Sequence, residues 1–140
     1  GYDDGYTALW DVIEEKMTVC RTTPCIDTLH DMGGGLRNYH NKEDYIYTLN
    51  PQNGAYPLSI NFIAFDIELN YDYLKLYDGL DTSAPLIGIY TGTNSPAAFT
   101  ANSGALTLWF DADNATTSPG WELIYNCNLP ATVLPDSVYC

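Results

Sequence analysis

Basic residues are scarce in this sequence, and none follows Lys75. The 5 Lys and Arg residues stand against 18 Asp and Glu residues, which gives a formal net charge of −13. A charge of this sign repels phosphate backbones and anionic lipid surfaces, so nucleic acid and membranes are poor partners. A cationic partner or a bound divalent ion would relieve the repulsion. A solvated acidic surface that only aids solubility explains the composition equally well.

The sequence also lacks an apolar run of transmembrane length and a signal-peptide pattern, so we expect a mature, secreted and soluble product. Catalytic signatures are missing as well. The two histidines, His30 and His40, form no metal-binding frame, and no nucleophile-elbow motif occurs. We therefore expect a protein that is not an enzyme.

Helix-forming runs are rare after the first twenty residues, whereas the chain holds 12 Tyr, 4 Phe and 3 Trp. Aromatic residues are enriched in strands, so the composition favours an all-β fold. Short runs with strand character, separated by turn residues and by no helical crossover, predict a two-sheet antiparallel β-sandwich or jelly roll. These runs are 44–49, 58–65, 73–77, 86–90, 105–110 and 121–127.

The 140 residues suit one domain with extensions at both ends. We expect residues 1–25 to be an N-terminal extension with a short helix at about 8–17, which Thr7 would cap. Residues 26–127 would form the sandwich, beginning with a turn-rich loop over 26–43. Residues 128–140 would be an extended C-terminal strap that ends in Cys140.

The four cysteines lie near the two ends of the chain, and their spacing does not match a zinc knuckle. They are Cys20, Cys25, Cys127 and Cys140. Disulfides are the better interpretation, and they imply an oxidising, extracellular compartment. Four cysteines allow three connectivities. We favour the two local pairings, although a bond from the first pair to the second would clamp the N-terminal extension onto the sandwich.

Acidic side chains gather in two loop regions of the predicted sandwich. Asp66, Glu68 and Asp72 belong to the first region, and Asp111, Asp113 and Asn114 to the second. Calcium takes six to eight hard oxygen ligands, so two such loops that meet at one edge would form a calcium site. The alternative is that these are ordinary turn residues that point into solvent. Asn114 also begins an N-glycosylation pattern.

A series of motifs in the central segment resembles the CUB domain family of extracellular jelly-roll modules. The motifs are FDIE at 65–68, YDYLKLYDG at 71–79, APLIG at 84–88, YTG at 90–92, LTLWF at 106–110 and GW at 120–121. The similarity covers about residues 32–127, with a weaker match that begins at Asn38-Tyr39. It implies a β-sandwich used for extracellular recognition. In the family's calcium-binding subset, the positions matching Glu68, Asp72 and Asp113 hold the ion, and Tyr39 supports them.

The sequence departs from the family pattern at two places. Only three residues separate Glu68 from Asp72, where the family usually has a longer insert with a cysteine, so the family's usual internal disulfides are missing. Ala115 and Thr116 stand where calcium-binding members often have Ser and Asn, so backbone carbonyls or the Asn114 amide would have to compensate. Asp66 and Asp111 are further supporting candidates. These departures resemble divergent, bacterial members of the family.

The leading hypothesis is a calcium-dependent recognition module whose remaining acidic charge receives a Lys or Arg of a partner protein. A second hypothesis is a self-assembling subunit of an extracellular fibre or surface layer that docks through its terminal extensions. A third is a carbohydrate-binding accessory domain of a secreted enzyme. Trp109 and Trp121 suit packing better than sugar stacking. The exposed contacts would instead be Tyr71, Tyr73 and Tyr90.

Overall fold

The computed structural model describes residues 25–129 of the chain. Within them, Cys25–Asn128 form one compact unit. The helix expected at 8–17, the residues Cys20 and Cys140, and the strap from 130 onward lie outside the described residues.

Eight strands and one short 3-10 helix make up the described part of the chain. They are β1 (Ile26–His30), η1 (Gly34–Leu36), β2 (Asp44–Leu49), β3 (Leu58–Asp66), β4 (Tyr73–Tyr77), β5 (Leu86–Tyr90), β6 (Phe99–Ala101), β7 (Leu106–Asp111) and β8 (Gly120–Cys127). Within this part, no helix has the length and apolar character needed to cross a membrane.

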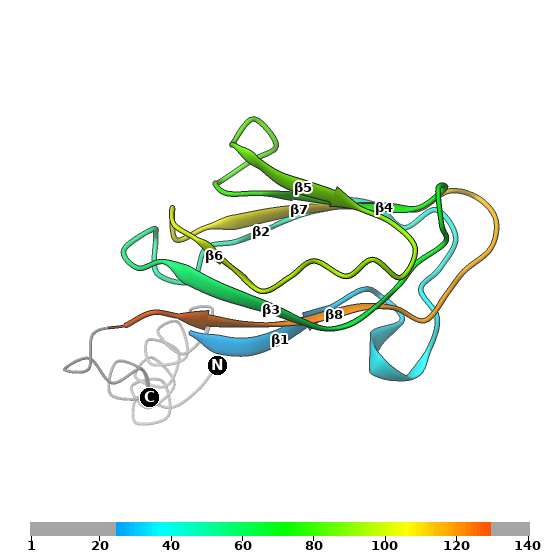
Figure 1. Cartoon of the computed structure of the whole chain (residues 1–140), viewed down its shortest axis with the longest axis horizontal. Helices are drawn as coiled ribbons and strands as arrows, with labels where there is room; N and C mark the ends of the chain where they lie inside the picture. Colours follow the sequence, from blue (N-terminus) through cyan, green and yellow to red (C-terminus); the bar gives the residue numbers. More distant parts are fainter. Residues whose placement is uncertain (1–24, 130–140) are drawn as a thin grey trace, which may run out of the picture. The chain divides into compact units, whose positions relative to one another are not determined.

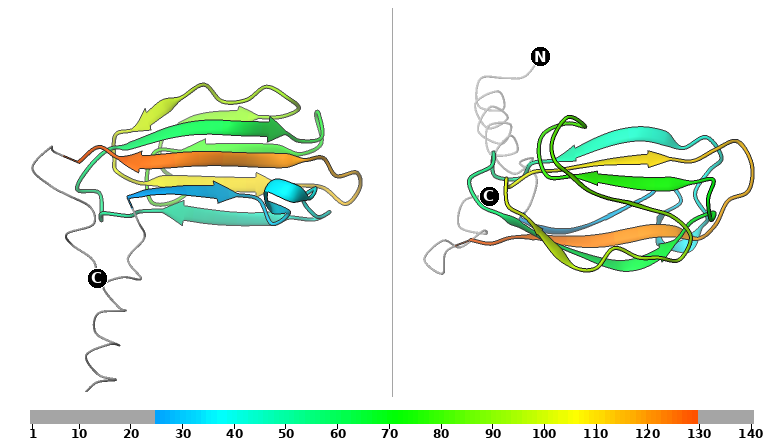
Figure 2. Two further views of the ribbon diagram at one scale, coloured as in Figure 1. Left: turned by 90° about the horizontal axis from the view of Figure 1, so that it is seen from below. Right: turned by 45° about the horizontal axis from the view of Figure 1, so that its top comes forward.

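The strands form two four-stranded sheets that lie face to face (Figure 1). One sheet has the order β1-β8-β3-β6 and the other β2-β7-β4-β5, with antiparallel pairing throughout. Figure 2 shows the first sheet from its outer side, with β8 between β3 and the shorter β1. The arrangement confirms the predicted all-β, two-sheet antiparallel sandwich.

The six predicted strands are confirmed, and their bounds differ from the prediction by at most one residue. The predicted loop over 26–43 is wrong for Ile26–His30, which form β1, and β6 was not predicted at all. Both are edge strands with little buried apolar surface. Four of the five side chains of β1 are exposed, so its place depends on the backbone ladder with β8. A ladder of this kind leaves no hydrophobic pattern in the sequence.

The core lies between the two sheets and is built from alternate residues of the central strands. Its fully buried members include Leu58, Ile60, Leu74, Leu76, Leu106, Leu108, Phe110 and Leu123. Trp121 of β8 is 2% exposed and packs edge-on against Phe110 of the opposite sheet, with ring centroids 6.0 Å apart. Trp121 is therefore a core residue, whereas Trp109 alternates with the buried residues of β7 and is partly exposed.

Two buried carboxylates hold the connection between β1 and β2. Asp31 accepts hydrogen bonds from the backbone N–H groups of Trp121 at 2.7 Å and Gly33 at 2.8 Å. Glu43 accepts the N–H groups of Met32 at 2.8 Å and His40 at 2.7 Å. Carboxylates that accept backbone N–H groups make strong, charge-assisted hydrogen bonds. These contacts fix the loop that carries Tyr39 to one end of the sandwich.

Gly120 has no room for a side chain at the start of β8. Its φ is +99°, a conformation that residues with a Cβ rarely adopt. A Cβ at this position would lie 1.9 Å from Oδ2 of Asp31, the atom that accepts the Trp121 N–H. Glycine at this position therefore permits the close approach between Asp31 and β8.

Replacing Gly120 with Ala should lower the free energy of unfolding by about 2–4 kcal/mol, because the positive φ is strained and Asp31 must move away from Trp121. Urea denaturation followed by tryptophan fluorescence measures this change. Gly35→Ala is the matched control, since a Cβ there would have Glu122 Oε1 at 3.9 Å as its nearest atom. We expect the control to change stability by about 0.5 kcal/mol or less. Equal losses in the two variants would contradict the proposed role of Gly120.

Candidate functional site

The two acidic loops predicted from the sequence lie at the same end of the sandwich (Figure 1). One follows β3 and the other follows β7. Because Tyr73 of β4 pairs with Asp111 of β7, the residue just before β4 and those just after β7 are neighbours. Asp72 and Asp113 therefore meet through the register of one antiparallel strand pair.

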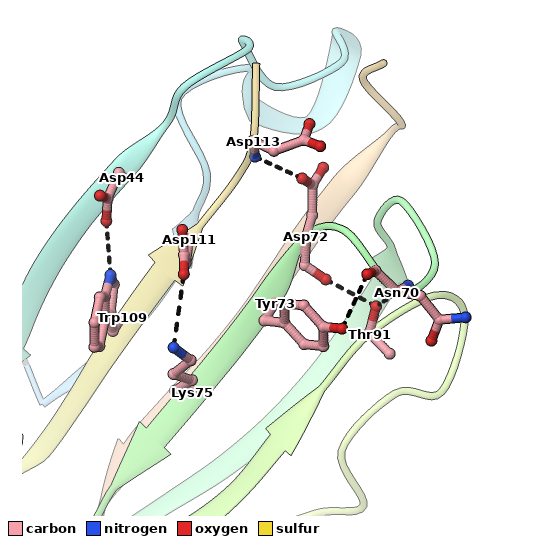
Figure 3. Close-up of polar contacts among 9 residues, drawn as sticks. All are labelled: Asp44, Asn70, Asp72, Tyr73, Lys75, Thr91, Trp109, Asp111 and Asp113. Atoms are coloured by element: carbon pink, nitrogen blue, oxygen red, sulfur yellow. Dashed lines mark hydrogen bonds and ion pairs between the residues drawn. The ribbon is translucent and has the colours of Figure 1, made fainter. Parts of the chain in front are cut away.

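Glu68, Asp72 and Asp113 each offer a carboxylate oxygen, and these three oxygens lie within 4.8 Å of one another. Asp72 is at the centre and is 0% exposed. Its Oδ1 accepts the backbone N–H of Asp113 at 2.7 Å, as Figure 3 shows. Its own backbone N–H donates to the carbonyl of Glu68 at 3.1 Å. A single residue thus links the loop after β3 to the loop after β7.

The phenol of Tyr39 contacts Asp72 and the backbone of Glu68 and is 1% exposed. Its O–H donates to Oδ2 of Asp72, and its oxygen accepts the backbone N–H of Glu68 at 3.0 Å. The ring packs edge-on against Phe110, with centroids 5.0 Å apart. Burial, followed by the hydrogen bond to Asp72, raises the pKa of Tyr39 far above its ordinary value. Tyr39 is therefore a neutral hydrogen-bond donor to the cluster.

Thr91 is part of the same end of the sandwich and was not predicted from the sequence. Its hydroxyl contacts the carbonyls of Glu68 at 3.1 Å and Asp72 at 2.8 Å, and accepts the N–H of Asn70 at 2.9 Å. Figure 3 shows Thr91 beside the backbone of Asp72. The feature that could have indicated its role is its position directly after β5, the strand that pairs with β4. Thr91 holds the backbone that presents the two carboxylates.

The carboxylate of Glu68 has an unsatisfied oxygen. Oε2 is buried and has no hydrogen-bond partner. Burial raises the pKa of Glu68, and the nearby charges of Asp113 and Asp72 raise it further. The ion pair found within residues 25–129 joins Lys75 to Asp111. No basic side chain of this part of the chain therefore neutralises the cluster. The site holds excess negative charge and a buried acceptor that lacks a donor or a cation.

The structure does not bring the carboxylates of Asp66 and Asp111 into this cluster. Asp66 is the last residue of β3 and lies outside the group of three carboxylates. Oδ2 of Asp111 is 3.6 Å from Nζ of Lys75, which also lies 4.0 Å from the centre of the Trp109 ring. Asp111 therefore points toward Lys75 of the neighbouring strand β4 (Figure 3). Asn114 is exposed to solvent.

The donor set matches a hard divalent cation. Oxygens bound to one Ca²⁺ lie about 2.3–2.6 Å from it, so two of them are at most about 5 Å apart. The three carboxylate oxygens meet this limit. The unpartnered Oε2 of Glu68 is the kind of atom that a cation would satisfy. Glu68, Asp72 and Asp113 could therefore hold Ca²⁺, with backbone carbonyls or water completing the coordination.

The fold and the site together define an antiparallel jelly-roll binding module with an acidic end. The family model for the CUB domain matches residues 31–125, and the chain belongs to this family. The resemblance seen in the sequence is confirmed. Domains of the family act as non-catalytic binding modules, which also confirms that the chain is not an enzyme.

Relatives and solved structures agree with this assignment. Cubilin of Canis lupus familiaris is 36% identical over 93 residues, which are 63% of this chain and 2% of cubilin. Neuropilin-2 of Mus musculus is 30% identical over 92 residues, which are 51% of this chain and 10% of neuropilin-2. The crystal structure of the MASP-1 CUB2 domain bound to Ca²⁺ superposes with a TM-score of 0.64 and 25% identity, covering 75% of this chain and 95% of that one. The chain thus spans a small part of these two relatives.

Replacing Glu68 with Gln should stabilise the calcium-free protein at pH 7, because a neutral amide removes repulsion from Asp72 and Asp113. The raised pKa of Glu68 means that the folded state takes up a proton at higher pH than the unfolded chain. The wild type therefore gains stability as the pH falls through this raised pKa. The advantage of the variant should shrink over the same range, since protonated Glu resembles Gln.

Urea denaturation of both proteins in chelator, at a series of pH values from 7 to 4, measures this difference. A variant that is less stable than the wild type at pH 7, or a difference that does not change with pH, would contradict the assigned environment of Glu68.

Proposed function

We propose that this chain is a calcium-dependent extracellular recognition module that binds a basic side chain of a partner protein at its acidic end. The observation that carries the proposal is the cluster of Glu68, Asp72 and Asp113, whose oxygens lie close enough together to share one ion. The proposal draws further support from the Ca²⁺ bound to the CUB2 domain of MASP-1.

Calcium would supply positive charge at the point where the two acidic loops meet. The carboxylates of Glu68 and Asp113 would become direct ligands, and the bound ion would favour a single arrangement of their loops. Asp72 already receives hydrogen bonds on both of its oxygens from Tyr39 and Asp113, so its position is set by the protein itself. A site built in this way needs little rearrangement to bind the ion, which favours affinity.

The surface beside the carboxylates suits the side chain of a lysine or arginine. Leu69 is 56% exposed and Tyr71 is 63% exposed, and both lie between Glu68 and the start of β4 in the same loop. Apolar and aromatic surface can pack against the methylene stem of a long basic side chain. The carboxylate charge left over after one Ca²⁺ has bound would attract its cationic head. Tyr71 is therefore the best-placed contact residue of the three tyrosines predicted to be exposed.

An extracellular location follows from the need for calcium and from the cysteine content. Sites built from a few carboxylates in surface loops work where calcium is present at about 10⁻⁴–10⁻³ M, the range of extracellular modules. Four cysteines that are available for disulfides indicate an oxidising compartment. Both features agree with a module that works outside the cell.

Calcium should stabilise the wild type, whereas Asp113→Ala should abolish the effect. At a concentration of about 100 times Kd, a ligand adds about 2.7 kcal/mol, so the melting temperature should rise by roughly 10 °C. Calorimetric titration with calcium, with thermal melts in calcium and in chelator, measures both effects. Magnesium should bind more weakly, because it requires shorter distances and stricter octahedral geometry.

Asp111→Asn is the matched control for this experiment. The carboxylate that it removes is two residues from Asp113, but this carboxylate faces Lys75 instead of the cluster. An exposed ion pair contributes about 1 kcal/mol at most, so the variant should fold and respond to calcium as the wild type does. Loss of calcium binding in Asp111→Asn, or its survival in Asp113→Ala, would overturn the proposed ligand set.

A lysine probe should bind only to the calcium-loaded protein. We expect millimolar Nα-acetyl-lysine amide to shift the backbone amide resonances of Glu68, Leu69 and Tyr71 in the presence of calcium and to leave them unchanged in chelator. Nα-acetyl-norleucine amide has a stem of similar length without the ammonium group and serves as the control. Equal shifts with both probes would show that charge plays no part and would contradict the proposed mode of recognition.

A further inference from the structure

Two cysteines lie opposite each other at the end of the sandwich away from the acidic cluster. Cys25 directly precedes β1, and Cys127 is the last residue of β8. The register of these strands pairs Ile26 with Asn126, so the next pair along is Cys25 with Cys127. The N–H of Cys127 donates to the carbonyl of Cys25 at 2.8 Å, which extends the ladder to this pair.

This placement agrees with the Cα separation that a disulfide requires. Directly opposed residues of a hydrogen-bonded antiparallel pair have Cα atoms about 5.5 Å apart, and disulfides span Cα distances of about 4.4–6.8 Å. Opposed residues also point to the same face of the sheet. Here that face is the core, because Cys25 is 2% exposed and Cys127 is 3% exposed.

Both thiols are free and buried in this structure. Burial raises the pKa of Cys127 to about 12, and a side-chain hydrogen bond with Cys25 contributes to the increase. A thiol with a high pKa is a poor nucleophile and metal ligand at neutral pH, since the thiolate is the reactive form. The pair is therefore suited to a structural bond that forms while the chain folds and its thiols are still accessible.

We propose that Cys25 and Cys127 form an interstrand disulfide that closes the sandwich. The reaction is thiol–disulfide exchange with a low-molecular-weight or protein disulfide as the oxidant. The two cysteines lose two protons and two electrons and form one Sγ–Sγ bond. The oxidant accepts the electrons and protons, and its own disulfide is reduced to two thiols.

The bond would secure an edge strand that contributes few side chains to the core. Most side chains of β1 are exposed, so few apolar contacts keep it on the sheet. Asp31, which follows β1, fixes one end of the strand by accepting the N–H of Trp121. The disulfide would fix the other end through Cys127, and both ends of this edge strand would then be attached to β8.

This pairing differs from the local pairings that the sequence favoured. A sulfur atom forms one disulfide, so a bond between Cys25 and Cys127 excludes both Cys20–Cys25 and Cys127–Cys140. The sequence could not distinguish these arrangements, because Cys25 and Cys127 become neighbours only through the pairing of β1 with β8. The strand β1 itself was not predicted.

Peptide mapping of the full chain tests the proposal directly. The protein is refolded in a glutathione redox buffer, its free thiols are alkylated, and it is denatured and digested with trypsin and an Asp-specific protease without reduction. Cleavage after Arg21 and before Asp27 isolates Cys25 in residues 22–26, and cleavage before Asp113 and Asp136 isolates Cys127 in residues 113–135. Cys20 and Cys140 fall in separate peptides.

We expect mass spectrometry to find the peptides 22–26 and 113–135 joined by a disulfide. The same linked species should be present in a Cys20→Ser, Cys140→Ser double variant, which leaves the proposed pair as the only cysteines in the chain. Peptides that link Cys20 to Cys25 or Cys127 to Cys140 would overturn the proposal. So would recovery of Cys25 and Cys127 in alkylated form after oxidative refolding.

A thermal measurement on that double variant separates a stabilising bond from an incidental one. The bond closes a loop of about one hundred residues, and cross-links of this size are among the more strongly stabilising. Reduction should therefore lower the melting temperature by at least roughly 10 °C. Adding Cys25→Ser and Cys127→Ser to the variant should abolish this response to the reductant. A melting temperature that reduction does not change would contradict the structural role.

Discussion

The buried carboxylate of Asp72 is the interaction on which the arrangement of the acidic end depends. Its two oxygens accept hydrogen bonds from the phenol of Tyr39 and the backbone N–H of Asp113. The segment before β2, the loop after β3 and the loop after β7 are all joined at this one side chain. A carboxylate without solvent contact requires such partners, because an unpaired buried charge is costly. The same requirement ties these three segments together, so the grouping of the carboxylates is a property of the fold.

The fold could be predicted from the sequence wherever burial leaves a pattern. In β7, Leu106, Leu108 and Phe110 alternate with Thr107 and Trp109, and this period of two indicates a strand with one face in the core. The edge strand β1 has no such alternation, because its side chains are mostly exposed and backbone hydrogen bonds hold it. Its existence depends on β8, almost one hundred residues away, and local sequence carries no record of that partner.

The site could be predicted only in part, for a related reason. Glu68, Asp72 and Asp113 were identified through matching motifs, and the register of β4 with β7 places the last two side by side. Asp66 and Asp111 stand close to them in sequence but lie outside the cluster. Asp111 is a strand residue, and its side chain faces Lys75 instead of the loop. Proximity in sequence does not distinguish the last residue of a strand from a residue in the loop that follows. A shift of one or two positions along the chain decides which way the carboxylate points.

The positions of Cys25 and Asn128 have a mechanical consequence. The chain enters and leaves the sandwich on adjacent strands, at the end away from the acidic loops. Tension applied to these two points would pull β1 and β8 apart from their shared end and would load their hydrogen bonds one after another. The opposed cysteines are the first pair to bear that force. Stretching of any longer polypeptide that contains this domain would therefore act on the cysteine pair well before it disturbed the far loops.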